Sequence, residues 1–168
     1  GKGGVGKTTL ALNLAIAFAQ DNLRVCLWDV AGDANLDLLC GLDSPRSFES
    51  VSNGTHTFED VVQRGPDNLA LLTGAGPSSF VKNITQNATF ANRFDRFQSQ
   101  FDVVLLDLPA VTGEESRAVL SACEMVVAVT TPDPVSIAAT YSFIKTSGTL
   151  SNRWSLLVNQ AQTDQAAF

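Results

Sequence analysis

Glycines and lysines at the start of the chain have a spacing that suits the binding of phosphate groups. Residues 1–8, GKGGVGKT, match the pattern G-x-x-x-x-G-K-[ST] at every fixed position. Glycines allow backbone N–H groups to turn inward around phosphates, and a helix that starts at the motif directs its positive end toward them. A plain glycine turn is the alternative, and the apolar run that follows from residue 8 disfavours it. The pattern therefore predicts a nucleoside triphosphate site.

The chemistry of such a site gives each residue type a role. Lys7 is expected to reach the β- and γ-phosphates, and the Thr8 hydroxyl to be a ligand of Mg²⁺. ATP and Mg²⁺ are the expected cofactors. The residues predicted to hold the nucleotide here are Gly3, Gly4, Val5, Gly6, Lys7, Thr8 and Thr9.

Two carboxylates, Asp29 and Asp107, each close an apolar segment that is typical of a buried strand. Ligands of open α/β sheets bind at the carboxyl ends of the strands, so both side chains are expected to face the nucleotide. Asp107 fits an acid that holds Mg²⁺ through its water shell, with a turn-forming role as the alternative. The predicted metal-binding residues are Thr8, Asp29 and Asp107. Asp102, at the start of its strand, is expected at the opposite edge in solvent.

Composition limits the classes of function. The net charge of −6 disfavours a general nucleic-acid surface, which needs clustered Lys and Arg, so nucleic acid is not an expected partner. No apolar run reaches the length of about 18 residues that a membrane-spanning helix requires. Three cysteines without paired spacing indicate thiols in a reducing cytosol, and the isolated His56 indicates a surface loop.

The elements that must position these residues alternate along the chain. Thr57–Asp60 resembles a capping box that opens a short helix, and a phenylalanine stripe (90, 94, 97 and 101) predicts a helix whose apolar side is core. Alternation of apolar strands with helices predicts an α/β fold, a doubly wound and mostly parallel β-sheet with helices on both faces, in one domain over residues 1–168. Strands are predicted at 23–28, 69–73, 101–108, 125–130 and 154–159, and further helices at 8–20, 35–41, 113–123 and 135–145.

The second lysine of the loop makes the motif more specific. GKGGVGKTT resembles the deviant Walker A motif of the MinD/ParA family of ATPases. In that family the early lysine reaches across a dimer to the phosphates of the other subunit. The resemblance thus implies that Lys2, together with Lys7, is catalytic, that the fold is a P-loop NTPase of the SIMIBI type, and that ATP drives homodimerisation.

Resemblance extends over nearly the whole chain. VCLWDVAGDANLDLLCGL is similar to the second strand and switch I of the family, and FDVVLLDLPA to its Walker B strand and switch II. VVAVTTPDPVSIAATYSFIK resembles the FlhG/FleN branch, the MinD-like ATPases that set flagellar number and placement. Asn159 resembles the strand-end Asn of that branch, which contacts adenine, and the sequence after it lacks the Lys and Asp of a GTP-specific N-K-x-D element.

The same resemblance implies partners and missing segments. The implied partners are a flagellar GTPase, a flagellar transcription regulator and basal-body proteins. The family has a first strand before the phosphate loop and further elements at the C-terminal end, so the chain is expected to be a fragment truncated at both ends. A membrane-targeting helix would follow residue 168, which implies a cytoplasmic protein with peripheral contact at the inner membrane.

Switch I departs from the family pattern D-x-D-x-G-x-x-N-x-D. The present run is one residue shorter, and Ala31 stands where the second Asp, which orients the attacking water, is expected. Either Asp33 takes that role after a shift of the loop, with slow hydrolysis, or the role is lost and the protein is a non-hydrolysing scaffold. A ParA/MinD-type partitioning or cell-division ATPase is a further alternative. An iron–sulfur carrier ATPase is disfavoured because residues 107–116 hold no cysteine and no C-x-x-C occurs.

Overall fold

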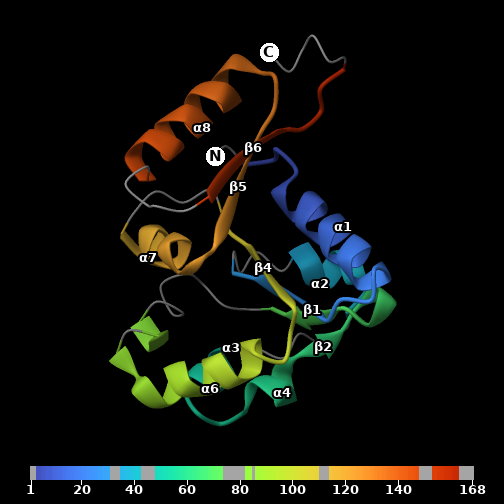
Figure 1. The fold of residues 1–168 in the computed structure, drawn as a ribbon, viewed down its shortest axis with the longest axis vertical. Helices are drawn as coiled ribbons and strands as arrows, with labels where there is room; N and C mark the ends of the chain where they lie inside the picture. Colours follow the sequence, from blue (N-terminus) through green and yellow to red (C-terminus); the bar gives the residue numbers. More distant parts are fainter. Residues whose placement is uncertain are drawn as a thin grey trace. The chain divides into compact units, whose positions relative to one another are not determined.

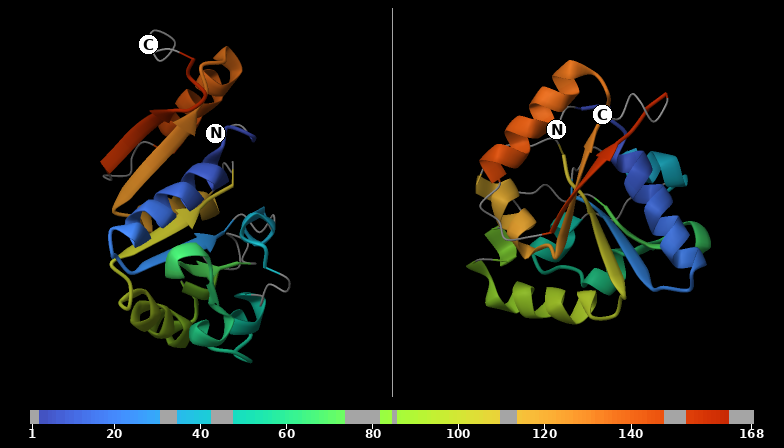
Figure 2. Two further views of the ribbon diagram at one scale, coloured as in Figure 1. Left: turned by 90° about the vertical axis from the view of Figure 1, so that its right-hand side faces the viewer. Right: turned by 45° about the horizontal axis from the view of Figure 1, so that its top comes forward.

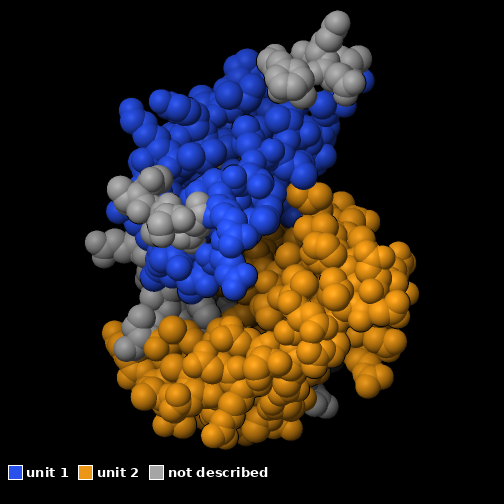
Figure 3. Space-filling model, in the orientation of Figure 1, with its two compact units in different colours: residues 1–7, 109–168 blue, residues 8–108 orange. Residues whose placement is uncertain are grey.

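Strands and helices alternate along most of the chain in the computed structural model, except that α2, α3 and α4 follow one another after β1 (Figure 1). The structure describes residues 3–30, 35–42, 48–73, 82–84, 86–109, 114–147 and 153–162. They belong to two compact units, one of residues 8–108 and one of residues 1–7 with 109–168 (Figure 3). Compact units occur both within one domain and as separate domains, so the single domain over residues 1–168 stays a prediction.

The described helices and strands follow the predicted order. The helices are α1 (Lys7–Gln20), α2 (Asn35–Cys40), α3 (Phe48–Ser52), α4 (Phe58–Val61), the 3-10 turn η1 (Pro66–Asn68), α6 (Ala88–Gln98), α7 (Glu114–Ala122) and α8 (Pro134–Ser147). The strands are β1 (Val25–Asp29), β2 (Gln63–Arg64), β3 (Ala70–Leu72), β4 (Val103–Asp107), β5 (Met125–Thr130) and β6 (Arg153–Val158). None of the described helices is long and apolar enough to cross a membrane.

The unit of residues 8–108 contains a sheet with the strand order β2-β3-β1-β4. Strands β3, β1 and β4 are parallel, and β2 is antiparallel to β3. Every residue of β1 is buried, as expected for a central strand with both faces covered. The mostly parallel sheet is therefore confirmed. The short antiparallel strand β2 was not predicted, because two polar residues carry no strand pattern.

Helix α1 covers one face of this sheet and lies alongside β1 and β4 (Figure 2). Side chains of a strand alternate between the two faces, so Val25 and Leu27 of β1 point to the same side. They form a buried cluster with Ala15 of α1, Leu36 of α2 and Leu71 of β3. An uncharged stretch such as residues 8–19 can form a stable helix here because the sheet removes its apolar side from water.

An aromatic cluster fills the other face. Its members are Trp28, Phe48, Phe58, Phe90, Phe94 and Phe97. The rings of Trp28 and Phe48 lie 5.0 Å apart, and those of Phe58 and Phe97 stack at 4.9 Å. The prediction that the phenylalanine stripe is core is confirmed, and helices lie on both faces of the sheet. Helix α3, which supplies Phe48, was not predicted because a single phenylalanine in a polar stretch gives no periodicity.

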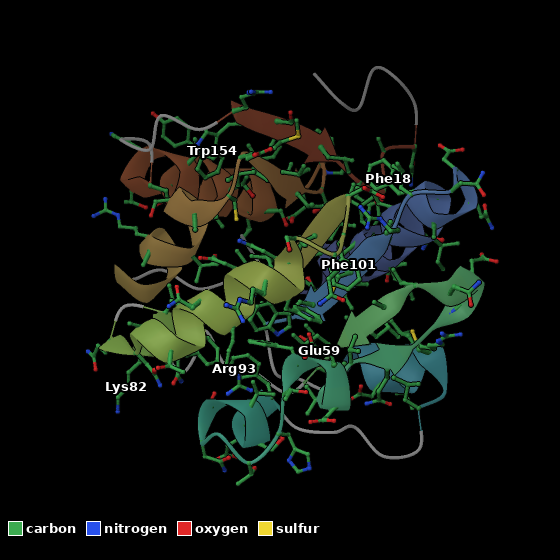
Figure 4. The ribbon with its side chains drawn as sticks, turned by 60° about the horizontal axis from the view of Figure 1, so that its bottom comes forward. Phe18, Glu59, Lys82, Arg93, Phe101 and Trp154 are labelled. Carbon is green, nitrogen blue, oxygen red and sulfur yellow. The ribbon has the colours of Figure 1, made fainter. Side chains whose placement is uncertain are left out.

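Polar contacts join α6 and the residues just after it to the segment of α3 and α4. Arg93 donates to the backbone oxygen of His56 at 2.7 Å, and Gln100 donates to Glu59 at 3.0 Å (Figure 4). The predicted capping box exists: the Thr57 hydroxyl accepts from the Asp60 backbone N–H, and the Asp60 carboxylate accepts from that of Thr57. His56 is exposed, as expected for a loop residue.

The unit of residues 1–7 with 109–168 is built on β5 and β6. These strands are parallel and pair from Met125 with Arg153 to Thr130 with Val158. Helix α8 packs on β5, and the rings of Phe143 and Trp154 meet edge to face at 6.1 Å. The Asp133 carboxylate caps the helix by accepting from the backbone N–H of Val135 and of Ser136, each at 3.1 Å.

We predict that the aromatic cluster dominates the stability of the larger unit. Phe58 is 1% exposed and contacts four other rings of the cluster. Phe58→Ala should lower the free energy of unfolding by about 3–5 kcal/mol, because it leaves a cavity among rings that cannot collapse onto it. Phe58→Leu, the matched control, should cost only about 1–2 kcal/mol. Denaturant unfolding followed by circular dichroism measures both, and equal losses for the two variants would contradict this account.

Candidate nucleotide-binding site

The loop Gly3–Gly6 leads directly into α1, which begins at Lys7. Gly4 has φ +78° and Gly6 has φ +91°, values that side chains other than glycine adopt only with strain. Between them Val5 is 2% exposed, so its side chain anchors the loop in the protein interior. The backbone thus turns twice around a buried valine before the helix starts. Left-handed residues of this kind can direct backbone N–H groups at an anion, so residues 3–7 fit the predicted phosphate loop.

Asn159 lies against this loop, although 154 residues separate it from Val5. Its Nδ2 donates a hydrogen bond to the Val5 backbone oxygen at 2.9 Å. A Cβ on Gly6 would lie 2.5 Å from the same nitrogen, so no other residue fits at that position without displacement. Two residues predicted to contact the nucleotide from opposite ends of the chain are therefore brought together. No sequence pattern predicts the hydrogen bond itself, because the resemblance assigns Asn159 only to the adenine.

The carboxylates Asp29 and Asp107 lie side by side in the unit of residues 8–108. They are register partners at the ends of β1 and β4, and they are 1% and 3% exposed. The backbone N–H of Val30 donates to the Asp107 backbone oxygen at 3.1 Å, which continues the pairing beyond the strands. Alternation along β1 and β4 places both side chains on the face that α1 covers.

Thr8 lies at the same edge as these two carboxylates. Residues 21–24 join the end of α1 to the start of β1, so the helix runs antiparallel to the strand. The first turn of α1, which contains Thr8, is therefore at the carboxyl end of β1. A hydroxyl and two carboxylates are oxygen donors of the kind that Mg²⁺ prefers, and Mg²⁺ keeps several of its waters. These residues fit the predicted metal site.

Other predicted site residues are placed only in part. Lys7 is half-buried and Thr9 is exposed in the first turn of α1, where the Thr9 carbonyl accepts from Asn13 at 2.7 Å. Lys2, Ala31 and Asp33 lie outside the described residues. The roles predicted for Lys2 and Asp33 therefore stay predictions.

Asp102 is exposed at the start of β4, as predicted, and it also has a partner that the sequence did not indicate. At the opposite end of β4 from Asp107, it forms a bidentate ion pair with Arg24, with contacts of 2.7 and 3.1 Å. These hydrogen bonds from Arg24 lower the pKa of Asp102 to about 2, so the carboxylate is ionised at neutral pH. The pair joins the starts of β1 and β4 and is remote in the sheet from the predicted site.

The cysteines have no reactive environment. Burial raises the pKa of the Cys26 thiol to about 12, and it also raises the pKa of Cys40 and of Cys123. A thiol is nucleophilic as the thiolate, so a raised pKa lowers the fraction of reactive thiolate at neutral pH. Within the described ranges, no three His, Cys, Asp or Glu side chains gather in a way that could hold a metal ion.

The fold is an α/β fold of the P-loop NTPase type. A family model described as "AAA domain" matches residues 1–159. The antiactivator FleN of Pseudomonas aeruginosa is 33% identical over 148 residues, which cover 86% of this chain and 53% of that protein. The flagellum site-determining protein YlxH of Helicobacter pylori is 30% identical over 166 residues, 95% of this chain and 55% of that protein.

The fold has solved counterparts. The septum site-determining protein MinD of Pyrococcus horikoshii, complexed with Mg-ADP, has a TM-score of 0.78 at 22% identity and covers 99% of this chain and 70% of its own. The present chain belongs to the MinD/ParA family of P-loop ATPases, and within it resembles the FlhG/FleN branch. It spans about half the length of the curated relatives it matches.

We predict that Gly6 cannot be replaced without loss of the nucleotide. Gly6→Ala combines an unfavourable φ with a clash against Asn159, so affinity for a fluorescent ATP analogue should fall at least about tenfold. Gly54→Ala is the matched control, because Gly54 has φ +81°, open space around it and a place in a loop remote in sequence. It should cost stability yet keep the affinity. Equal affinity of the Gly6 variant and the parent would contradict the assignment of this loop.

Proposed function

We propose that the protein binds MgATP and acts as an ATP-dependent dimerising switch of the MinD/ParA type. The observation that carries the proposal is the phosphate loop, in which glycines with left-handed backbone flank a buried valine and lead into α1. Backbone N–H groups and the positive end of a helix attract anionic oxygens irrespective of the rest of the ligand. Asn159 at the end of β6 is proposed to contact adenine, which would favour ATP over GTP.

In the proposed site, the negative charge of the phosphates is neutralised both by a lysine and by Mg²⁺. Lys7 would balance the β- and γ-phosphates, while Thr8, Asp29 and Asp107 would hold Mg²⁺, with Asp107 acting through its water shell. Mg²⁺ supplies positive charge to the phosphate oxygens. The burial of both carboxylates at one strand edge supports this assignment, because it fixes their positions before the ion binds. The MinD of Pyrococcus horikoshii, which has the same fold, is complexed with Mg-ADP.

Dimerisation is proposed to depend on Lys2. An ordinary phosphate loop needs one lysine, and GKGGVGKT carries two. In the proposed dimer Lys2 of each subunit would contact the phosphates bound by the other. ATP would then hold the two subunits together, and loss of the γ-phosphate would release them and their protein partners.

The proposed cellular role is the control of flagellar number or placement. It rests on the similarity to an antiactivator and to a flagellum site-determining protein. The proposed partners are a flagellar GTPase, a flagellar transcription regulator or basal-body proteins. A partitioning or cell-division positioning role is the alternative, supported by the similarity to the septum site-determining MinD of Bacillus subtilis, 32% identical over 139 residues.

Hydrolysis is proposed to be slow. The attacking water must be oriented by a carboxylate or amide, and Ala31 stands where the family has that carboxylate. Asp33, two residues on, is proposed to take over the role from a less favourable position. A displacement of about 1 Å in such a group can cost about a hundredfold in rate. The shortened switch I also supports a second candidate function, a nucleotide-dependent scaffold that does not hydrolyse ATP.

Removal of the early lysine should separate binding from assembly. Lys2→Ala should bind ATP nearly as tightly as the parent, because Lys7 still balances the phosphates, yet stay monomeric with ATP. Light scattering of the complete protein with and without ATP measures the mass. Lys7→Ala is the control that should lose ATP binding and dimerisation together. A Lys2→Ala protein that dimerises with ATP as the parent does would show that Lys2 is only a solvated charge.

Removal of Asp33 should abolish turnover without affecting binding. We expect tight binding of ATP by the parent, with slow phosphate release that falls to background in Asp33→Ala. Phosphate release and ATP affinity are measured on the same preparations, with Asp21→Ala as a control for the loss of a surface carboxylate. No hydrolysis in the parent would favour the scaffold. Rapid hydrolysis that Asp33→Ala leaves unchanged would show that another residue orients the water.

A further inference from the structure

We propose that Asn159 is a positioning residue for the phosphate loop, in addition to any contact with the base. The geometry points to this role because its amide holds the Val5 carbonyl, and so sets the orientation of the Val5–Gly6 peptide. The inference rests on the proposed function in one respect, that the loop binds phosphate. It adds that a residue at the end of β6 orients the backbone of the phosphate loop.

The backbone holds Asn159 firmly. Its N–H donates to the Thr130 carbonyl at 2.7 Å, which extends the pairing of β5 and β6 by one residue beyond Val158. Gln160 then takes a left-handed φ of +59°, so the chain turns away after Asn159. The side chain therefore projects from the fixed end of a sheet ladder. A donor held in this way can fix the loop that accepts its hydrogen bond.

The hydrogen bond determines where the Gly6 N–H points. A peptide group is planar and trans, so the carbonyl of Val5 and the N–H of Gly6 point in opposite directions. When the Val5 oxygen faces Asn159, the Gly6 N–H must face away from it. A phosphate loop works by directing such N–H groups at phosphate oxygens. Asn159 thus holds the peptide in the orientation in which its N–H is available to a ligand.

The Asn159 amide lies so close to Gly6 that the contact depends on glycine at this position. A Cβ at Gly6 would meet the Asn159 nitrogen at 2.5 Å, so only glycine leaves room for the amide. The Val5 side chain is buried, which opposes rotation of the loop as a whole. Because glycines on both sides of Val5 weaken the backbone's own preference, the orientation of this peptide depends on outside contacts.

One amide can serve both the loop and a base. The Asn side chain has two N–H donors and one carbonyl acceptor, and the bond to Val5 occupies a single donor. The second donor and the oxygen stay available for an adenine edge. A residue that only contacted the base would not affect ligands without a base. A residue that orients the loop must affect them, and this difference separates the two roles.

The test compares a nucleotide with inorganic tripolyphosphate, which has no base. Asn159→Leu keeps the side-chain shape but removes the donor, and Gln162→Leu, at an exposed position, is the matched control. Calorimetric titration of the complete protein in Mg²⁺ should show tripolyphosphate affinity reduced about three- to tenfold in Asn159→Leu, and unchanged in Gln162→Leu. Unchanged tripolyphosphate affinity in Asn159→Leu, with or without a loss of ATP affinity, would overturn the proposal.

A second readout needs no ligand. The ¹⁵N–¹H resonance of Gly6 is expected to shift and broaden in ligand-free Asn159→Leu, because the peptide loses its fixed orientation, while the thermal midpoint stays close to that of the parent. Asn159→Ala replaces the leucine variant if that protein does not fold. A Gly6 resonance that moves in neither variant would overturn the proposal. If the parent binds neither ATP nor tripolyphosphate, the proposed function fails, and the Gly6 resonance still decides whether Asn159 orients the loop.

Discussion

The backbone between Gly4 and Gly6 is the constraint on which the rest of the site depends. Both glycines have left-handed φ values, which only glycine adopts without strain, and Val5 between them is buried. A loop with this geometry has little conformational preference of its own, so its surroundings must hold it. The burial of the Val5 side chain and the hydrogen bond from the Asn159 amide both do so. The start of α1 at Lys7 follows directly and adds the partial positive charge of its first turn.

The positions of Asp29 and Asp107 are determined by the pairing of the parallel strands β1 and β4. In the register of β1 with β4, Asp29 is opposite Asp107, and α1 returns the chain so that Thr8 reaches the same edge. The residues before these acids are apolar because both faces of the sheet are covered, by α1 on one side and by the aromatic cluster on the other. The burial that stabilises the sheet therefore also fixes the two acids at its edge.

Much of this could be predicted from the sequence, for identifiable reasons. Helix α1, strands β1, β4 and β5 and the phenylalanine stripe were predicted because apolar spacing depends on burial in a sheet. The strand-end position of Asp29 and Asp107 followed from the same pattern. Helix α3 and strand β2 were missed, because they are held by tertiary contacts such as that of Phe48 with Trp28 and not by local periodicity. The hydrogen bond of Asn159 to Val5 was missed because no spacing rule relates positions so far apart in the chain.

In a phosphate-loop site, the binding of a nucleotide and its hydrolysis depend on different features of the sequence. Phosphates are held largely by backbone N–H groups and by the field of a helix terminus, and these depend on glycine positions that residues 1–8 retain in full. Orientation of an attacking water depends on a single side-chain oxygen, whose effect declines steeply with displacement. Under the proposed function, the shortened segment Asp29–Asp37 would alter only the second requirement, because Asp29 itself stays paired with Asp107 in the sheet. A phosphate loop can therefore keep its affinity for nucleotide even where the rate of hydrolysis is low.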